Sequence, residues 1–216
     1  MNRTKIEWCD YVWNPVVGCT GSCPYCYARK MAHRFHRDFT PHWVESNFQK
    51  AMSRKPSRIF VNSMSDLADW HKSWYLRVLK EILSNPQHLF LFLSKQPWKC
   101  EWFQTQNAML GYSVTRQMEY EALLDIRAYE RVSFLSLEPL LEPINLASFY
   151  HGPMIRWIIV GAETGNRKGR VVPEPGWIKS IYEYATDNGI PLFFKESLRP
   201  FWPFDGYNYF PQEYPA

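Results

Sequence analysis

Cys19, Cys23 and Cys26 have the spacing C-x3-C-x2-C, in a chain of 216 residues that contains five cysteines. Thiolates packed this closely are typical of a metal site rather than of a disulfide framework. Three sulfur ligands can hold three irons of a [4Fe-4S] cluster and leave the fourth iron open to a second molecule, whereas ligation by four cysteines closes the site. The sequence therefore predicts an iron–sulfur site with one open position.

The residues around these cysteines suit a loop that wraps a cluster. Gly18 and Gly21 permit sharp backbone bends, and Pro24 stiffens the last turn. Tyr25 places an aromatic ring directly before the third cysteine. Cys9 and Cys100 lie outside the motif and are interpreted as ordinary thiols, although Cys9 is near enough in sequence to serve as an extra ligand.

The motif resembles the signature of the radical S-adenosylmethionine (radical SAM) superfamily, with Cys19, Cys23, Tyr25 and Cys26 matching residue by residue. Other segments resemble an uncharacterised phage and bacterial family with a three-cysteine motif that is regarded as radical-SAM-like, and this likeness covers nearly the whole chain. Those segments are Lys5-Ile6-Glu7-Trp8, Trp13-Asn14-Pro15, Val61-Asn62-Ser63-Met64-Ser65-Asp66-Leu67, Leu135-Ser136-Leu137-Glu138-Pro139-Leu140 and Val160-Gly161-Ala162-Glu163-Thr164-Gly165.

The resemblance implies an enzyme with a [4Fe-4S] cluster and S-adenosylmethionine (SAM) as cofactors. In that superfamily the open iron chelates the amino and carboxylate groups of SAM. One electron then cleaves SAM to methionine and a 5′-deoxyadenosyl radical, which abstracts hydrogen from a substrate. The resemblance also implies an external electron donor, such as a flavodoxin or ferredoxin. It does not name the substrate, and no catalytic residue beyond the cofactor ligands is predicted.

Short apolar runs alternate with helical patterns along most of the chain, which predicts βα units and a parallel sheet. We expect an α/β fold, a partial (β/α)6-7 TIM-like barrel, because a full barrel usually needs about 250 residues. The predicted strands are an irregular one at 11–17, followed by 58–62, 88–93, 109–114, 132–137, 156–161 and 190–195. The predicted helices are 27–37, 44–52, 74–83, 98–106, 117–128 and 175–188, the last with Gly189 as its C-cap.

The chain is expected to form one domain, because its length suits a single core. Within that domain, residues 1–57 carry the cluster loop and flanking helices. Residues 58–199 carry the repeated βα units, and residues 200–216 form a tail rich in proline and aromatic residues.

Most of the predicted strands end in polar or charged residues. In α/β barrels the chemistry collects at these carboxyl ends, so the side chains there are candidates for a shared cleft. Ser94 and Lys95 suit the carboxylate of SAM, while Asn62, Ser63 and Asp66 suit its ammonium group, where radical SAM enzymes commonly have a Gly-Gly-Glu motif that this sequence lacks. The remaining candidates are Glu138 or Glu163 for the ribose diol, Gly161 for close approach of adenine, and Ser113 and Lys195.

The composition and net charge limit which kinds of binding partner are expected. Aromatic residues make up 17% of the chain, which predicts a core or cleft built from large rings. The net charge of +4 permits a nucleic-acid partner without requiring one, and the scattered basic loops favour a nucleic acid or nucleotide as substrate. No run of about 18 apolar residues and no signal sequence are present, which predicts a cytoplasmic protein that does not bind a membrane.

Two alternatives remain open at this stage. The cysteines could form a structural zinc site, with Cys9 or His33 as a fourth ligand, in a non-catalytic module that binds a partner or nucleic acid. The chain could also be a degenerate member of the superfamily that binds a cluster without doing chemistry. Against the zinc module, such modules are small and need metal to fold, whereas this chain is long enough for its own core.

Overall fold

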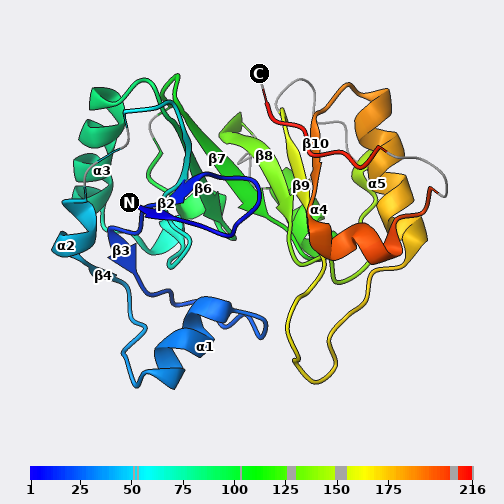
Figure 1. The fold of residues 1–216 in the computed structure, drawn as a ribbon, viewed down its shortest axis with the longest axis horizontal. Coiled ribbons are helices and arrows are strands. Elements are labelled where there is room, and N and C mark those ends of the chain that lie inside the picture. The colour runs from blue at the N-terminus through cyan, green and yellow to red at the C-terminus, as the bar shows by residue number, and fades with distance from the viewer. Residues whose placement is uncertain are drawn as a thin grey trace. The chain divides into compact units, whose positions relative to one another are not determined.

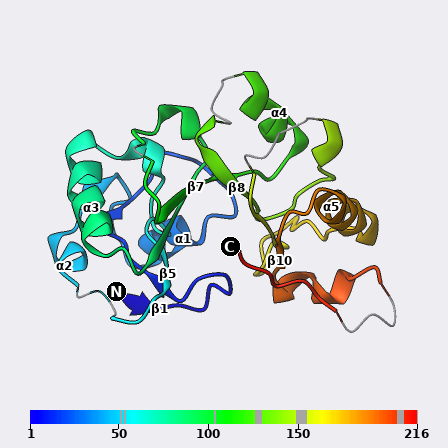
Figure 2. The ribbon, with the colours of Figure 1, turned by 90° about the horizontal axis from the view of Figure 1, so that it is seen from above.

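The computed structural model describes residues 1–50, 52, 54–102, 104–125, 130–148, 155–204 and 209–215. Contacts within the chain divide it into two compact units, Met1–Leu110 and Gly111–Ala216. The boundary falls inside strand β7 (Ala108–Ser113). Figures 1 and 2 show the elements of both units.

The sheet of unit 1 is mostly parallel. Its strands follow the order β1 (Asn2–Arg3), β2 (Tyr11–Val12), β5 (Arg58–Phe60), β6 (Leu89–Ser94) and β7. β2 pairs with β5, and β5 with β6, in parallel, while β1 is antiparallel to β2. A separate antiparallel pair consists of β3 (Val16–Val17) and β4 (His42–Trp43).

Unit 1 has three α-helices among its described residues. They are α1 (Tyr27–Arg34), α2 (Glu45–Phe48) and α3 (Lys72–Ser84), with short 3-10 turns at Leu67–Asp69 and Pro97–Lys99. α3 buries Tyr75, Val78 and Ile82, which share one face at helical spacing. These side chains meet the buried rings of Trp13 and Phe90 in the core, as the aromatic composition predicts.

Unit 2 contains three consecutive parallel strands, β8 (Val132–Leu137), β9 (Ile158–Val160) and β10 (Leu192–Phe194), in that order. Its helices are α4 (Gln117–Asp125) and α5 (Pro175–Asp187), with 3-10 turns at Leu146–Ser148 and Glu196–Phe201. Pro175 begins α5, where its missing N–H costs nothing. Gly189 follows its end with φ +63°, as the sequence predicts.

The α/β class with mainly parallel pairing is confirmed, but two local predictions are wrong and a third holds only in part. The strand expected at 11–17 breaks at Asn14 and Pro15 into β2 and β3, which belong to different sheets. The helix expected at 98–106 is absent from the described residues there beyond the turn Pro97–Lys99, because Cys100 is extended and buried and Trp102 packs against the core. The helix expected at 44–52 shortens to α2.

The predicted helix at 117–128 is confirmed as α4 up to Asp125, and its last residues lie outside the described part of the chain. In the tail, Gln212 pairs with Phe193 of β10, and Phe210 packs against Trp202. Within the described residues, no helix is both long enough and apolar enough to span a membrane.

Candidate metal and cofactor site

The cysteine loop runs from the end of β3 to the start of α1 and lies against the loop that follows β5. The backbone N–H of Gly18 donates to the carbonyl of Met64 at 3.0 Å, and that of Cys19 donates to Phe39 at 3.0 Å. Gly18 has φ +100°, and a Cβ there would lie 2.2 Å from the carbonyl oxygen of Thr40. Only glycine fits this entry to the loop.

Two of the three sulfurs accept hydrogen bonds from the backbone. The N–H of Gly21 donates to Cys19 Sγ at 3.2 Å, and the N–H of Arg29 donates to Cys26 Sγ at 3.4 Å, which makes Cys26 the N-cap of α1. A cavity of about 500 Å³ opens beside the loop, lined by Thr20, Gly21, Ser22, Cys23, Pro24, Cys26, Arg29, Lys30 and His33. The loop thus presents sulfur atoms at a space large enough for a ligand.

The loop's donor set fits an iron–sulfur cluster chemically. All five cysteines lie in described parts of the chain and are thiols rather than disulfides. Within those parts, no three His, Cys, Asp or Glu side chains stand close enough together to hold a metal ion. The fit rests instead on the soft sulfur donors and on the N–H groups aimed at two of them, since hydrogen bonds to cysteine sulfur tune such clusters.

Arg29 ties the two ends of the loop together. Its guanidinium donates to the carbonyl of Cys19 at 2.7 Å and to the carbonyl of Gly21, while it lies 5.0 Å from the ring centroid of Phe39. The Arg29 side chain therefore faces the cysteine loop. The position of Arg29, three residues after Cys26, indicates this direction, because long side chains on a helix lean back toward its N-terminus.

Asp69 holds the loop from the other side. Its carboxylate accepts from the N–H of Thr20 at 2.8 Å and from the Thr20 hydroxyl at 2.7 Å. Sequence reasoning missed this contact, which joins residues 49 positions apart. The contact fixes the residue between Cys19 and Gly21, so the loop is anchored on both flanks.

The thiol of Cys19 is held in its protonated form. Burial, opposed by the Gly21 N–H and reinforced by the charges of Asp66 and Asp69, raises the pKa of Cys19 to about 12. A thiol must lose its proton to bind a metal, so a cation at the loop would reverse this preference.

The candidates that follow β5 and β6 are joined in one hydrogen-bond network. Asp66 accepts from the hydroxyl of Ser94 at 2.5 Å, from the N–H of Lys95 at 2.9 Å and from the N–H of Ala68 at 2.9 Å. Burial raises the pKa of Asp66 against the opposing effect of these bonds. The Asn62 side chain exchanges hydrogen bonds with the backbone of Leu93 at 2.6 and 3.0 Å.

Lys95 and Ser63 connect this network to the cysteine loop. Lys95 Nζ lies 5.9 Å from the ring centroid of Tyr25, and the Tyr27 hydroxyl donates to the carbonyl of Ser63 at 2.6 Å. The Ser63 side chain pairs with that of Asn14 at 3.0 Å. The structure therefore brings the candidates of unit 1 beside the cysteine loop, and their contact with SAM stays a prediction.

In unit 2 the candidates gather at the carboxyl ends of β8, β9 and β10. Lys195 Nζ and Glu138 Oε1 form an ion pair at 3.5 Å, and both side chains are mostly buried. A Cβ on Gly161 would lie 3.0 Å from Lys195 Cδ and 3.2 Å from Glu138 Oε1, so glycine leaves room for the pair. Ser113 ends β7 and is half-buried.

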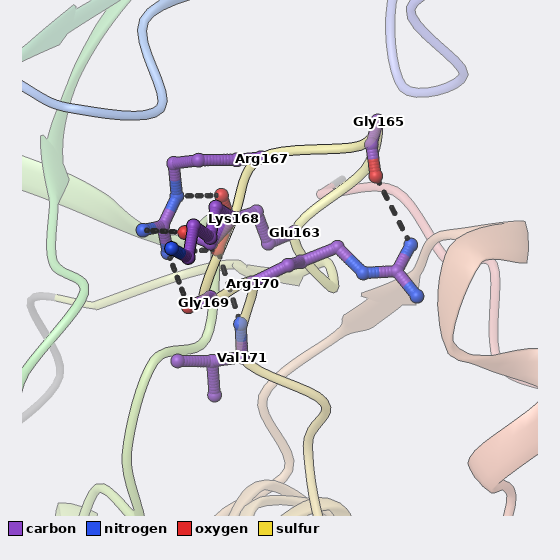
Figure 3. Close-up of polar contacts among 7 residues, drawn as sticks. All are labelled: Glu163, Gly165, Arg167, Lys168, Gly169, Arg170 and Val171. Carbon is purple, nitrogen blue, oxygen red and sulfur yellow. Dashed lines mark hydrogen bonds and ion pairs between the residues drawn. The ribbon is translucent and has the colours of Figure 1, made fainter.

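Glu163 is locked by an arginine from its own loop. Arg167 Nε and one terminal nitrogen donate to its two carboxylate oxygens at 2.5 and 2.7 Å, and the N–H of Val171 donates at 3.3 Å (Figure 3). Arg170 donates to the carbonyl of Gly165 at 3.3 Å. These contacts give the loop after β9 a defined shape, although most of its residues are exposed.

The remaining cysteines and His33 lie in different surroundings. Cys9 is buried, and its thiol donates to the carbonyl of Ile6 at 3.9 Å; Cys100 is buried against the core of unit 1. His33 is exposed on α1 and lines the cavity with Cys23 and Cys26. Of the two fourth ligands considered from the sequence, His33 is the one that shares this cavity.

Fold and site define an α/β protein with a three-cysteine loop beside the edge of a mostly parallel sheet. The chain belongs to the family described as "Protein of unknown function (DUF5131)", which matches residues 3–199. It is 34% identical over 70 residues to "Uncharacterized protein MJ0683" of Methanocaldococcus jannaschii, a match that covers 31% of this chain and 27% of that relative. The chain therefore spans only about a quarter of that relative's length. No solved structure matches the chain significantly.

Proposed function

We propose that this chain is a radical SAM enzyme, whose Cys19, Cys23 and Cys26 hold a [4Fe-4S] cluster. The observation that carries the proposal is the anchored loop, in which backbone N–H groups point at Cys19 Sγ and Cys26 Sγ beside a cavity of about 500 Å³. When bound, the cluster would supply one electron for cleavage of SAM to methionine and a 5′-deoxyadenosyl radical. The likeness of the motif to that superfamily supports the same conclusion.

The residues of unit 1 hold the loop and offer a cation for SAM. Asp69 and Arg29 fix the backbone on both flanks of Cys19 and Gly21. Lys95, which lies over Tyr25, suits the carboxylate of SAM. Asp66 accepts hydrogen bonds from the Ser94 hydroxyl and from the backbone N–H of Lys95, and so fixes the backbone of Lys95. In this proposal Asp66 and Ser94 therefore act mainly through Lys95.

The strand ends of unit 2, taken by themselves, carry groups that suit a nucleoside. Glu138, held by Lys195, suits the ribose diol. The role of Gly161 toward adenine rests on the sequence alone, because the ion pair occupies the space beside its Cα. Glu163 is less suited to the diol, because both of its oxygens already bind Arg167. Ser113 completes the set as a hydrogen-bonding group at a strand end.

The finer features of the account are also proposals. The βα units would form a partial (β/α)6-7 TIM-like barrel in a single domain, and the protein would act in the cytoplasm. A flavodoxin or ferredoxin would supply the electron. The substrate would be a nucleic acid or nucleotide, from which hydrogen is abstracted.

A second candidate is a non-catalytic zinc module that binds a partner or nucleic acid. It is favoured by one observation, the presence of His33 in the same cavity as Cys23 and Cys26, because a fourth ligand would complete a tetrahedral zinc site. Under this alternative the loop would bind zinc tightly and would need no SAM.

The test is anaerobic incubation of iron-reconstituted protein with SAM and dithionite, followed by chromatography for 5′-deoxyadenosine. We expect this product from the wild type and none from Cys23→Ala. Glu138→Gln should weaken SAM binding and leave the iron content unchanged. A protein that carries a full cluster and forms no 5′-deoxyadenosine would contradict the enzyme proposal and indicate a degenerate member of the superfamily.

A further inference from the structure

We propose that the exposed face of α1 is the docking surface for an acidic protein that carries single electrons. This inference rests on the proposed function, because a carrier is needed only if the loop holds a redox cluster. In the step that follows docking, the carrier is oxidised by one electron and the cluster is reduced by one. The surface consists of Tyr27, Lys30, Met31, Arg34 and Phe35, with Arg37 just beyond the helix.

The charge of this surface is mostly positive. Residues 27–37 contain four Arg or Lys residues and two His residues, and no Asp or Glu. Arg29 turns inward to the cysteine loop, whereas Lys30, Arg34 and Arg37 are exposed. Asp38, which is also exposed, directly follows Arg37, so the surface keeps an excess of exposed cations rather than a single sign of charge. Such an excess attracts an acidic partner and speeds its encounter.

The centre of the surface is apolar. Tyr27, Met31 and Phe35 are 52%, 46% and 57% exposed, although they share one face of the helix. The adjoining face of the helix buries Ala28 and Ala32. Aromatic residues, methionine and arginine are the side chains that protein interfaces favour, and an apolar centre with a charged rim is their usual arrangement.

The surface lies next to the site that an electron must reach. α1 begins at Cys26, and Lys30 and His33 line the cavity beside the cysteine loop. Figure 1 shows α1 at the lower edge of unit 1, clear of the other helices of that unit. A small protein docked on this face would therefore sit beside the loop, and small transient interfaces are typical of electron-transfer partners.

The aromatic side chains favour a protein over a single-stranded nucleic acid. The guanidinium carbons of Arg34 and Arg37 lie over the ring of Phe35, at 5.9 and 5.7 Å from its centroid. The ring of Tyr27 is tethered through its hydroxyl to the carbonyl of Ser63 at 2.6 Å. Stacking of bases needs an open ring face, which Phe35 would offer only after its two arginines moved away.

The test compares two reductants on cluster-loaded protein by stopped-flow absorbance. Reduced flavodoxin is the acidic carrier, and dithionite is a small reductant that needs no docking surface. Arg34→Glu should slow reduction by flavodoxin roughly tenfold or more at low ionic strength, and the difference should shrink as salt is added. Dithionite should reduce both proteins at the same rate.

Lys80→Glu is the matched control, because Lys80 is exposed on α3, away from α1 within unit 1 (Figure 1). It should reduce at the wild-type rate with both reductants. Equal flavodoxin rates in Arg34→Glu and Lys80→Glu would overturn the inference and leave the proposed function standing. A variant that loses affinity for a labelled single-stranded oligonucleotide, with flavodoxin reduction intact, would also overturn it. A wild type without a cluster contradicts the proposed function itself.

Discussion

Carboxylates near the cysteine loop of unit 1 bind backbone N–H groups, whereas those at the strand ends of unit 2 bind cationic side chains. Asp66 and Asp69 accept from the backbone of Lys95 and Thr20. Glu163 pairs with the two-pronged guanidinium of Arg167 at 2.5 and 2.7 Å, and Glu138 pairs with Lys195 at 3.5 Å. The bonds to N–H groups in unit 1 fix the position of the backbone. The pairs with cationic side chains in unit 2 neutralise the charge of the carboxylates.

The difference indicates where a ligand can enter each region. In unit 1, Asp69 is engaged in holding the cysteine loop and Asp66 in joining the segments after β5 and β6, which leaves sulfur as the loop's group for chemistry. In unit 2 the longer Glu138–Lys195 pair is easier for a bound diol or carboxylate to rearrange than the bidentate pair of Glu163. The predictions below alter one region at a time, and each control variant lies elsewhere in the same unit.

The largest effect is expected from Cys23→Ala, which removes one sulfur from the loop and leaves its anchors in place. Iron uptake and visible absorbance should fall to background, with the fold retained by circular dichroism. Cys100→Ala is the control, since that buried thiol packs in the core of unit 1, and it should bind iron like the wild type. Iron content of Cys23→Ala equal to the wild type would refute the ligand assignment.

The second prediction concerns the thiol of Cys19 in metal-free protein. With its pKa raised to about 12, this thiol should stay protonated at neutral pH. Its alkylation by iodoacetamide, followed by peptide mass spectrometry, should accelerate about tenfold per pH unit between about pH 8 and pH 10, because the thiolate reacts. The same peptide in urea should level off above about pH 9. A plateau by pH 9 in folded protein would contradict the buried environment.

A third, smaller effect is expected from Arg29→Met, which leaves the carbonyls of Cys19 and Gly21 without their charged donor. The free energy of unfolding, from urea titration of metal-free protein, should fall by about 1.5–3 kcal/mol. Arg29→Lys should recover part of this loss. Lys80→Met removes an exposed cation elsewhere and should change stability little; an equally small effect of Arg29→Met would remove its anchoring role.

The smallest effect is expected in unit 2. Glu163→Gln weakens the contact that holds Arg167 and the loop after β9 (Figure 3). Trypsin should then cleave after Arg167, Lys168 or Arg170 severalfold faster, because the loop opens more often. Glu196→Gln, which alters an exposed pair with Arg199, should leave cleavage in this loop unchanged. Unchanged cleavage in Glu163→Gln would show that the pair does not order the loop.

Much of the fold could be predicted from the chain because its signals are local. Apolar runs of strand length gave β5 to β10, and Gly189 marked the end of α5. The failures came where tertiary packing decides. Trp102 packs against the core instead of continuing a helix, and Pro15 splits what reads as one strand.

The residues of the candidate site can be read from the sequence, whereas the contacts that support them cannot. The spacing of the cysteines is visible in the sequence, and so are the polar residues at the strand ends. The contact of Asp69 with Thr20 spans 49 positions, and that of Asp66 with Lys95 spans 29. No local pattern encodes such pairs, so the contact that anchors the cysteine loop could not be predicted, and the contacts of the strand-end residues with SAM stay predictions.

The central claim is that this loop holds an iron–sulfur cluster with an open iron. The most direct measurement is quantification of iron, acid-labile sulfide and zinc in anaerobically purified protein, with electron paramagnetic resonance of the reduced sample before and after SAM is added. The account predicts iron and sulfide in equal amounts and a spectrum that changes with SAM. Protein that lacks iron and holds one tightly bound zinc per chain would contradict it.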